Sequence, residues 1–80
     1  MPNLSSHRQS PTLIALGGAI RRTRLEKGMS QEELSLRAEV DLSYVGRVER
    51  GDNNVAIMTL QKIASALEIS MSALLELADL

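Results

Sequence analysis

The chain has 80 residues, enough for one domain, with no cysteine and a single histidine, His7, so disulfides and a Cys/His zinc site are excluded. No apolar run approaches the ~20 residues that span a bilayer, and one aromatic residue, Tyr44, cannot form a stacking platform for single-stranded nucleic acid. The net charge is −1, but residues 1–50 hold eight basic and six acidic residues and residues 51–80 hold one and four, which favours a protein that binds an anion with one face.

The chain divides into a short polar segment and a helical domain. Residues 1–10 have no periodic apolar pattern, and we predict a flexible N-terminal tail there. Residues 11–80 carry apolar residues at helical spacing and no alternating run with hairpin signals. We therefore predict a compact all-α domain of five helices over residues 11–80.

The first helix is predicted to begin after Ser10 as N-cap, with Pro11 at its first position, and to end before Gly28. Gly17 and Gly18 lie inside it, each at a cost of about 1 kcal/mol relative to alanine. Such a pair indicates either close packing against a neighbour or a frayed start. The residues expected to face inward are Leu13, Leu16, Ile20 and Thr23.

The second and third helices are separated by only three residues, "EVD". The second begins at "SQEE", where Ser30 caps the helix and Glu33 reaches back in a capping box, and it ends near residues 38–39. The third follows Asp41 as cap and ends at Gly51. Its inward pair is Val45 and Val48. Two short helices joined so tightly must cross steeply, which is the helix-turn-helix arrangement.

The fourth helix is predicted over about residues 56–67, and the fifth begins after Ser70 as cap. The fourth helix is expected to turn Ile57, Leu60, Ile63, Ala64 and Leu67 inward. The last ten residues hold more apolar positions than one helix face buries, and an unburied apolar stripe favours a partner. We predict a homodimer whose interface consists of Met58, Met71, Leu74, Leu77 and Leu80.

Three runs in fixed order carry a family resemblance: "KGMSQEEL", "YVGRVERG" and "LQKIASALEIS". Over residues 20–75 the chain resembles the XRE or lambda-repressor-like helix-turn-helix domain. The short length and the "RLEKGMSQEEL" and "NNV" runs are also similar to the controller proteins of restriction–modification systems, which are small dimeric activator–repressors. Those proteins more often carry arginine at the position of Leu42, so a different operator is expected here.

The resemblance implies that the third helix enters the DNA major groove, which is wide enough for one helix. Its outer edge would then contact bases through Leu42, Ser43, Gly46 and Arg47. An arginine such as Arg47 pairs bidentately with guanine, whereas Leu42 offers only apolar contact, for example to a thymine methyl group. Gly46 lowers helix propensity, which close approach to DNA would explain.

Other residues are expected to hold the DNA backbone, which positions a protein without reading sequence. The resemblance implies phosphate contacts from Gln31, Tyr44, Arg50, Asn53 and Asn54. In the family, the first residue of the second helix donates to a phosphate beside the free N–H groups of the helix N-terminus. The resemblance also implies a structural salt bridge between Arg24 and Glu49 that ties the first helix to the third.

The expected function is a cytoplasmic, sequence-specific, double-stranded DNA-binding transcriptional regulator that acts as a homodimer on a palindromic operator and blocks or recruits RNA polymerase. No secretory leader, cofactor, metal or small-molecule ligand is expected. An enzyme is not expected either, because the neighbouring carboxylates Glu32 and Glu33 point to different sides of a helix. The alternative is a protein-interaction module such as an antitoxin or adaptor, although only the ten-residue tail is available to wrap a partner.

Overall fold

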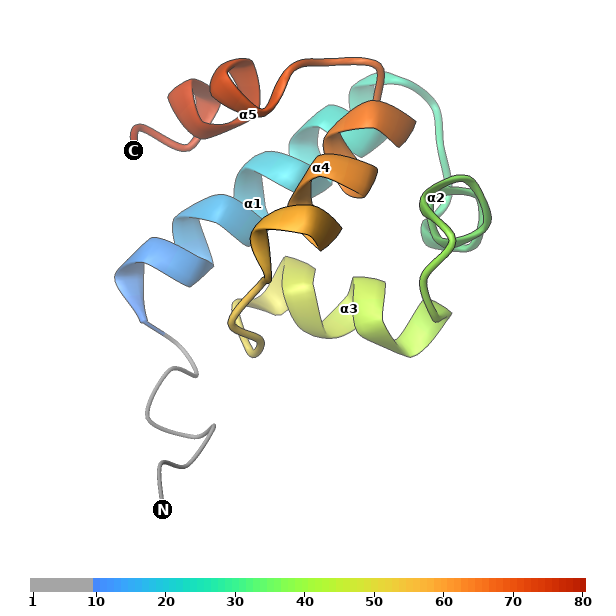
Figure 1. The fold of residues 1–80 in the computed structure, drawn as a ribbon, viewed down its shortest axis with the longest axis horizontal. Coiled ribbons are helices and arrows are strands. Elements are labelled where there is room, and N and C mark those ends of the chain that lie inside the picture. The colour runs from blue at the N-terminus through green and yellow to red at the C-terminus, as the bar shows by residue number, and fades with distance from the viewer. Residues whose placement is uncertain (1–9) are drawn as a thin grey trace.

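The computed structural model describes residues 10–80, so the predicted tail and His7 lie outside the described residues. The described part contains five α-helices and thereby confirms the all-α prediction (Figure 1). None of these helices is both long and apolar enough to cross a membrane. The helices are α1 (Pro11–Glu26), α2 (Gln31–Ala38), α3 (Leu42–Arg50), α4 (Ile57–Ala66) and α5 (Met71–Leu77).

The five helices enclose one apolar core. Helices α1 and α4 run through the middle of the molecule, with α3 below them and α5 above them in the view of Figure 1. Helix α1 packs against both α3 and α5, and α2 packs against α3 and α4. The largest fully buried side chains are Ile20, Leu34, Val45, Val48, Ile63, Leu67 and Leu74. Every helix contributes to this list, so α3 is held in place by the rest of the domain.

The predicted helix ends are confirmed at Ser10, Gly28, Ser30, Gly51 and Ser70. Ser10 Oγ accepts a hydrogen bond from the Leu13 N–H at 3.1 Å, and Ser30 Oγ accepts one from the Glu33 N–H at 2.9 Å. Gly28 follows α1 with a φ of 70°, a backbone conformation that glycine adopts without steric cost. Both ends of α1 and the start of α2 are therefore fixed by local sequence.

Three local predictions are wrong. The Glu33 carboxylate does not close a capping box but binds Arg37 one turn later, at 2.6 Å, where it meets an opposite charge. Asp41 occupies the N-cap position of α3 without a side-chain capping bond, because its carbonyl oxygen accepts from the N–H groups of Tyr44 and Val45. Ile57, expected inward, is 61% exposed because it is the first residue of α4, ahead of the buried stripe.

The turn between α2 and α3 contains an unfavourable residue. Glu39 has a φ of 59°, a left-handed conformation. Every residue that carries a Cβ atom is destabilised in this conformation. We expect Glu39→Gly to raise the free energy of unfolding by about 0.5–1 kcal/mol after the larger entropy of the unfolded glycine chain is subtracted. Glu68→Gly should gain a similar amount, because Glu68 has a φ of 63°. Urea denaturation measures both, and no gain at either position would contradict the backbone explanation.

Candidate nucleic-acid interface

The α2–turn–α3 unit is closed by its backbone. Residues 39–41 join the two helices, and the Val40 N–H donates to the Ser35 carbonyl oxygen at 3.0 Å. On α3, Val45 and Val48 are 1% and 2% exposed, which confirms the predicted inward pair. One face of α3 is thus fixed in the core, and the orientation of its other face is set.

The outer edge of α3 is open to solvent. Leu42 is 48% exposed, and Ser43 and Arg47 are also exposed. Gly46 is half-buried, and a Cβ added to it would lie 3.2 Å from a guanidinium nitrogen of Arg50 and near nothing else. The four residues predicted to contact bases therefore share one edge that no other helix of the described chain covers.

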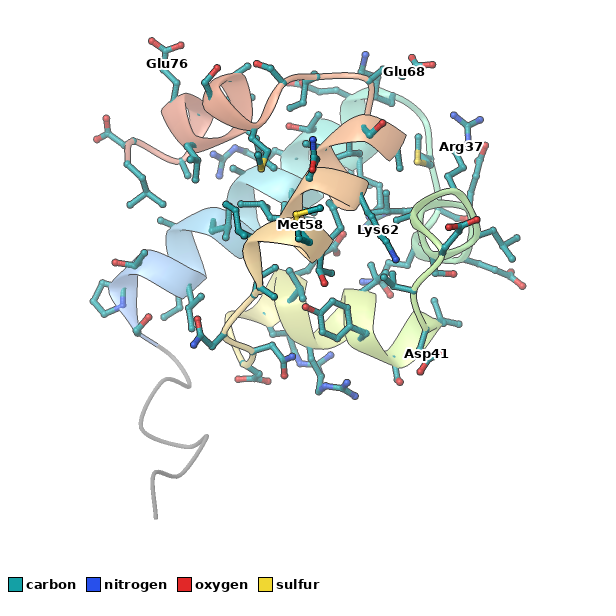
Figure 2. The ribbon with its side chains drawn as sticks, viewed as in Figure 1. Arg37, Asp41, Met58, Lys62, Glu68 and Glu76 are labelled. Atoms are coloured by element: carbon teal, nitrogen blue, oxygen red, sulfur yellow. The ribbon has the colours of Figure 1, made fainter. Side chains whose placement is uncertain are left out.

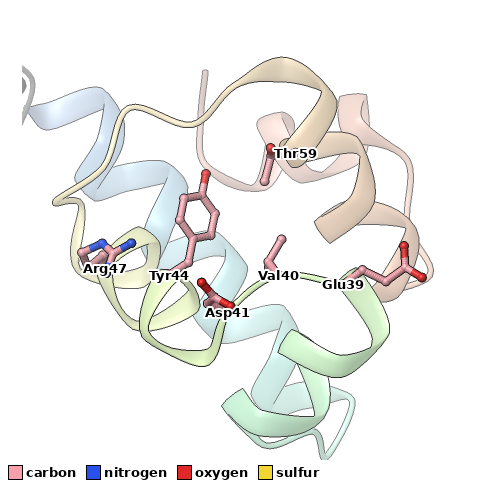
Figure 3. A pocket seen from close by; sticks show the side chains of 6 residues that line it. All are labelled: Glu39, Val40, Asp41, Tyr44, Arg47 and Thr59. Carbon is pink, nitrogen blue, oxygen red and sulfur yellow. The ribbon is translucent and has the colours of Figure 1, made fainter.

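The Arg47 side chain has two neighbours within the site. Its Nε donates to Asn53 Oδ1 at 3.4 Å, and its guanidinium carbon lies 5.8 Å from the centroid of the Tyr44 ring. That distance is within the range of a cation–π contact. Both side chains line an open hollow of about 320 Å³ together with Glu39, Val40, Asp41 and Thr59. In the view of Figure 3 the Tyr44 ring lies between Arg47 and Val40.

The sequence interpretation missed the contact of Arg47 with Tyr44, although the three-residue spacing of the two positions places them on one helix face. It also missed the hydrogen bond from Arg47 to Asn53. The Tyr44 hydroxyl is predicted to reach a phosphate or a base. The structure places its ring beside the arginine that is predicted to read a base, so the two predictions concern one cluster of side chains.

Apart from Tyr44, the residues predicted to contact phosphates fall into two groups. Gln31 is the first residue of α2, is half-buried, and donates from Nε2 to Glu49 Oε1 at 2.9 Å. Arg50, Asn53 and Asn54 lie at the end of α3 and in the following loop, and Arg50 Nε donates to Asp52 Oδ2 at 3.2 Å. The Gln31 amide carries a second N–H donor beyond the one that Glu49 accepts.

A buried ion pair joins α1 to α3. Arg24 Nε donates to Glu49 Oε2 at 2.7 Å and its side chain is 8% exposed, against 2% for Glu49. A second guanidinium nitrogen donates to Glu49 Oε1 at 3.1 Å, and the third donates to the Met29 carbonyl oxygen at 2.9 Å. The pair that the resemblance implies is therefore present. The additional hydrogen bond from Gln31 was not foreseen, because it joins positions 18 residues apart.

The predicted dimer surface requires one correction. Leu74 is 0% exposed, because its side chain fills the core between α5 and the rest of its own chain, so it offers nothing to a partner. Met58, Leu77 and Leu80 are 66%, 55% and 53% exposed, and Met71 is half-buried. Figure 2 shows Met58 on the outer side of α4. Four of the five residues thus remain available.

A family model described as Helix-turn-helix (HTH_3) matches residues 20–74, a range that holds α2, the turn, α3 and α4 entirely. The chain belongs to the XRE-type helix-turn-helix family. This is a family of DNA-binding transcriptional regulators and not of enzymes, as the sequence resemblance implies. The lambda-repressor-like fold predicted from the sequence is confirmed at the same time.

Within the family, restriction–modification controller proteins are similar to this chain. The solved structure of C.AhdI from Aeromonas hydrophila is 44% identical, with a TM-score of 0.76, over 78% of this chain and 94% of that protein. C.BamHI of Bacillus amyloliquefaciens is 34% identical over 64 residues, 79% of each chain. A structure of C.Esp1396I bound to a 19 base pair DNA duplex is 34% identical, with a TM-score of 0.81, over 88% and 93%.

Proposed function

We propose that this helix-turn-helix protein binds a palindromic double-stranded DNA operator as a homodimer and controls restriction–modification genes. One observation carries the proposal. The Arg47 edge of α3 is exposed while Val45 and Val48 on the same helix are buried, so the helix is held by its inner face and open to solvent where a base would be read. The similarity to C.AhdI and C.BamHI supports the assignment to restriction–modification control. Occupancy then blocks or recruits RNA polymerase according to the position of the operator.

The base-reading step belongs to α3 in the major groove. The Arg47 guanidinium presents parallel N–H donors that match O6 and N7 of guanine, a pairing that discriminates by about 1–3 kcal/mol. Leu42 offers an apolar contact for a thymine methyl group, and Ser43 donates or accepts. Gly46, with no side chain, lets the helix backbone approach the groove.

The phosphate-binding step belongs to the two ends of the helix-turn-helix unit. Gln31 uses its second amide N–H beside the free backbone N–H groups of α2, and Arg50, Asn53 and Asn54 act from the other end. The Tyr44 hydroxyl adds a further donor. Because Asn53 also accepts from Arg47, a phosphate contact and the base contact are joined by one hydrogen bond.

The apolar surface outside α3 supports the proposed homodimer. Met58, Leu77 and Leu80 are more than half exposed and lie on α4, on α5 and after it. Pairing through these residues and Met71 leaves the Arg47 edge uncovered. It also places two α3 helices on one face of DNA, with half-site centres about one turn, ~34 Å, apart.

Leu77→Glu tests the dimer. Each of the two leucines in the dimer loses about 1.5–3 kcal/mol of stabilisation when its burial is prevented. We therefore expect the dissociation constant of the dimer to rise more than 100-fold. Leu25→Glu is the matched control, because Leu25 is 52% exposed and lies on α1. Sedimentation equilibrium of the three proteins measures the effect. A Leu77→Glu protein as dimeric as the wild type would contradict this interface.

Selection of bound sequences from random double-stranded DNA tests the function itself. We expect a two-fold symmetric motif whose half-sites are centred about one turn apart. The affinity for the selected sequence should fall steeply with salt, because each neutralised phosphate releases condensed cations. No enrichment, together with capture of a stoichiometric protein partner and a DNA affinity that ignores salt, would favour the interaction-module alternative.

A further inference from the structure

The backbones of α1 and α3 approach each other closely at Gly17. A Cβ added to this buried glycine would lie 2.3 Å from the Val48 carbonyl oxygen and 2.7 Å from the Glu49 carbonyl oxygen. Both atoms belong to the backbone of the last turn of α3, so no flexible side chain can move aside. Of the two explanations that the sequence left open for Gly17, close packing therefore applies.

A second contact of the same kind lies three residues earlier on α1. Gly51 follows α3 with a φ of 80°, and a Cβ added there would lie 2.8 Å from Ile14 Cγ1 and 2.9 Å from Ile14 Cα. Ile14 and Gly17 are on one face of α1, since residues three apart are neighbours on a helix. Together they form a seat, the Ile14–Gly17 seat, on which the end of α3 rests.

The last turn of α3 carries two of the candidate DNA-binding residues, Arg47 and Arg50. Arg47 immediately precedes Val48, whose carbonyl touches the seat, and Glu49 binds Gln31 at the start of α2. A change in the distance between α1 and α3 therefore moves Arg47 relative to the DNA backbone that Gln31 holds. We propose that Gly17 is a positioning residue that sets the depth at which α3 reads bases; the inference rests on the proposed function.

The size of the displacement distinguishes the effect on base recognition from the effect on phosphate binding. An added Cβ requires a displacement of at least about 0.7 Å, because it would lie 2.3 Å from the Val48 carbonyl oxygen and real Cβ atoms do not approach other atoms within 3.0 Å. Base-edge hydrogen bonds require geometry held within about 0.5 Å. Long side chains that contact phosphates, such as Arg50, absorb such a shift. Selectivity should therefore fall while sequence-independent affinity remains.

Gly18→Ala is a matched control on the same helix. An added Cβ at Gly18 would meet only the end of the flexible Arg22 side chain, at 3.3 Å, and the substitution brings the same increase in helix propensity as Gly17→Ala. The experiment measures, for wild type and both variants, the dissociation constants for the selected operator and for a scrambled duplex, the salt dependence of both, and the free energy of unfolding.

We expect Gly17→Ala to lower the ratio of operator to scrambled affinity roughly tenfold or more. Its scrambled-duplex affinity and salt dependence should stay within twofold of the wild type, and Gly18→Ala should keep the ratio within twofold. An unchanged ratio in Gly17→Ala, or a parallel fall of both affinities, would overturn the proposal. If Gly17→Ala alone does not fold, the double variant Gly17→Ala/Gly18→Ala is measured. If the double variant does not fold either, the Ile14–Gly17 seat is needed for folding only, and the proposal is overturned. A wild type without operator preference would instead overturn the proposed function.

Discussion

Replacing Glu49 with alanine is expected to lower the free energy of unfolding by about 3–5 kcal/mol, the usual cost of breaking one partner from a buried ion pair. The substitution leaves the Arg24 guanidinium, 8% exposed, without its carboxylate, and it removes the acceptor of the Gln31 amide. A chain of this length has a total stability of roughly 4–12 kcal/mol. Circular dichroism during urea denaturation should therefore show a much earlier transition, or no folded baseline.

The Glu33–Arg37 pair is the control for this prediction. Its atoms are as close, at 2.6 Å, but the two side chains are 44% and 48% exposed. Water and salt screen such a pair, so Arg37→Ala should cost only about 0.3–0.5 kcal/mol. If Glu49→Ala and Arg37→Ala lowered the free energy of unfolding equally, burial would not explain the contribution of the Arg24–Glu49 pair, and the prediction would be contradicted.

Replacing Arg47 with alanine should remove discrimination at one base pair of each half-site. The expected loss there is about 1–3 kcal/mol, or roughly 5–150-fold in relative affinity. Replacing Gln31 with alanine should instead weaken binding equally on every DNA sequence, because a phosphate contact carries no sequence information. Dissociation constants for a panel of operators with single base-pair changes distinguish the two patterns.

Arg21→Ala controls for charge in the same panel. Arg21 is exposed on α1, so its removal subtracts one positive charge without touching α3. It should lower affinity slightly and equally across the panel, with the base preferences intact. If Arg47→Ala behaved like Arg21→Ala, Arg47 would be a general electrostatic contributor and not a reader of bases.

Much of the fold could be predicted from local sequence. Ser10 and Ser30 are strong capping residues, Gly28 suits the end of a helix, and three residues between two short helices leave few arrangements. The buried pair Val45 and Val48 follows from helical spacing alone. These features are local, because each depends on residues within about one turn of the chain.

The rest depends on contacts between distant positions. Leu74 and Leu77 look alike in the sequence, yet one is 0% and the other 55% exposed, which only the packing of α5 on its own domain decides. The Gln31–Glu49 hydrogen bond and the Gly17–Val48 approach join separate helices in the same way. Asp41 deviates locally, since its backbone carbonyl oxygen accepts from N–H groups at the start of α3 that its side chain was expected to cap.

Methylation interference at guanine N7 of the selected operator tests most directly whether the Arg47 edge of α3 reads bases in the major groove. N7 faces the major groove and is one of the two atoms that an arginine contacts on guanine. With wild-type protein, methylation of one guanine per half-site should block binding. With Arg47→Ala, methylation of that guanine should no longer matter. Binding that tolerates N7 methylation throughout the operator, or an identical interference pattern for both proteins, would contradict the account.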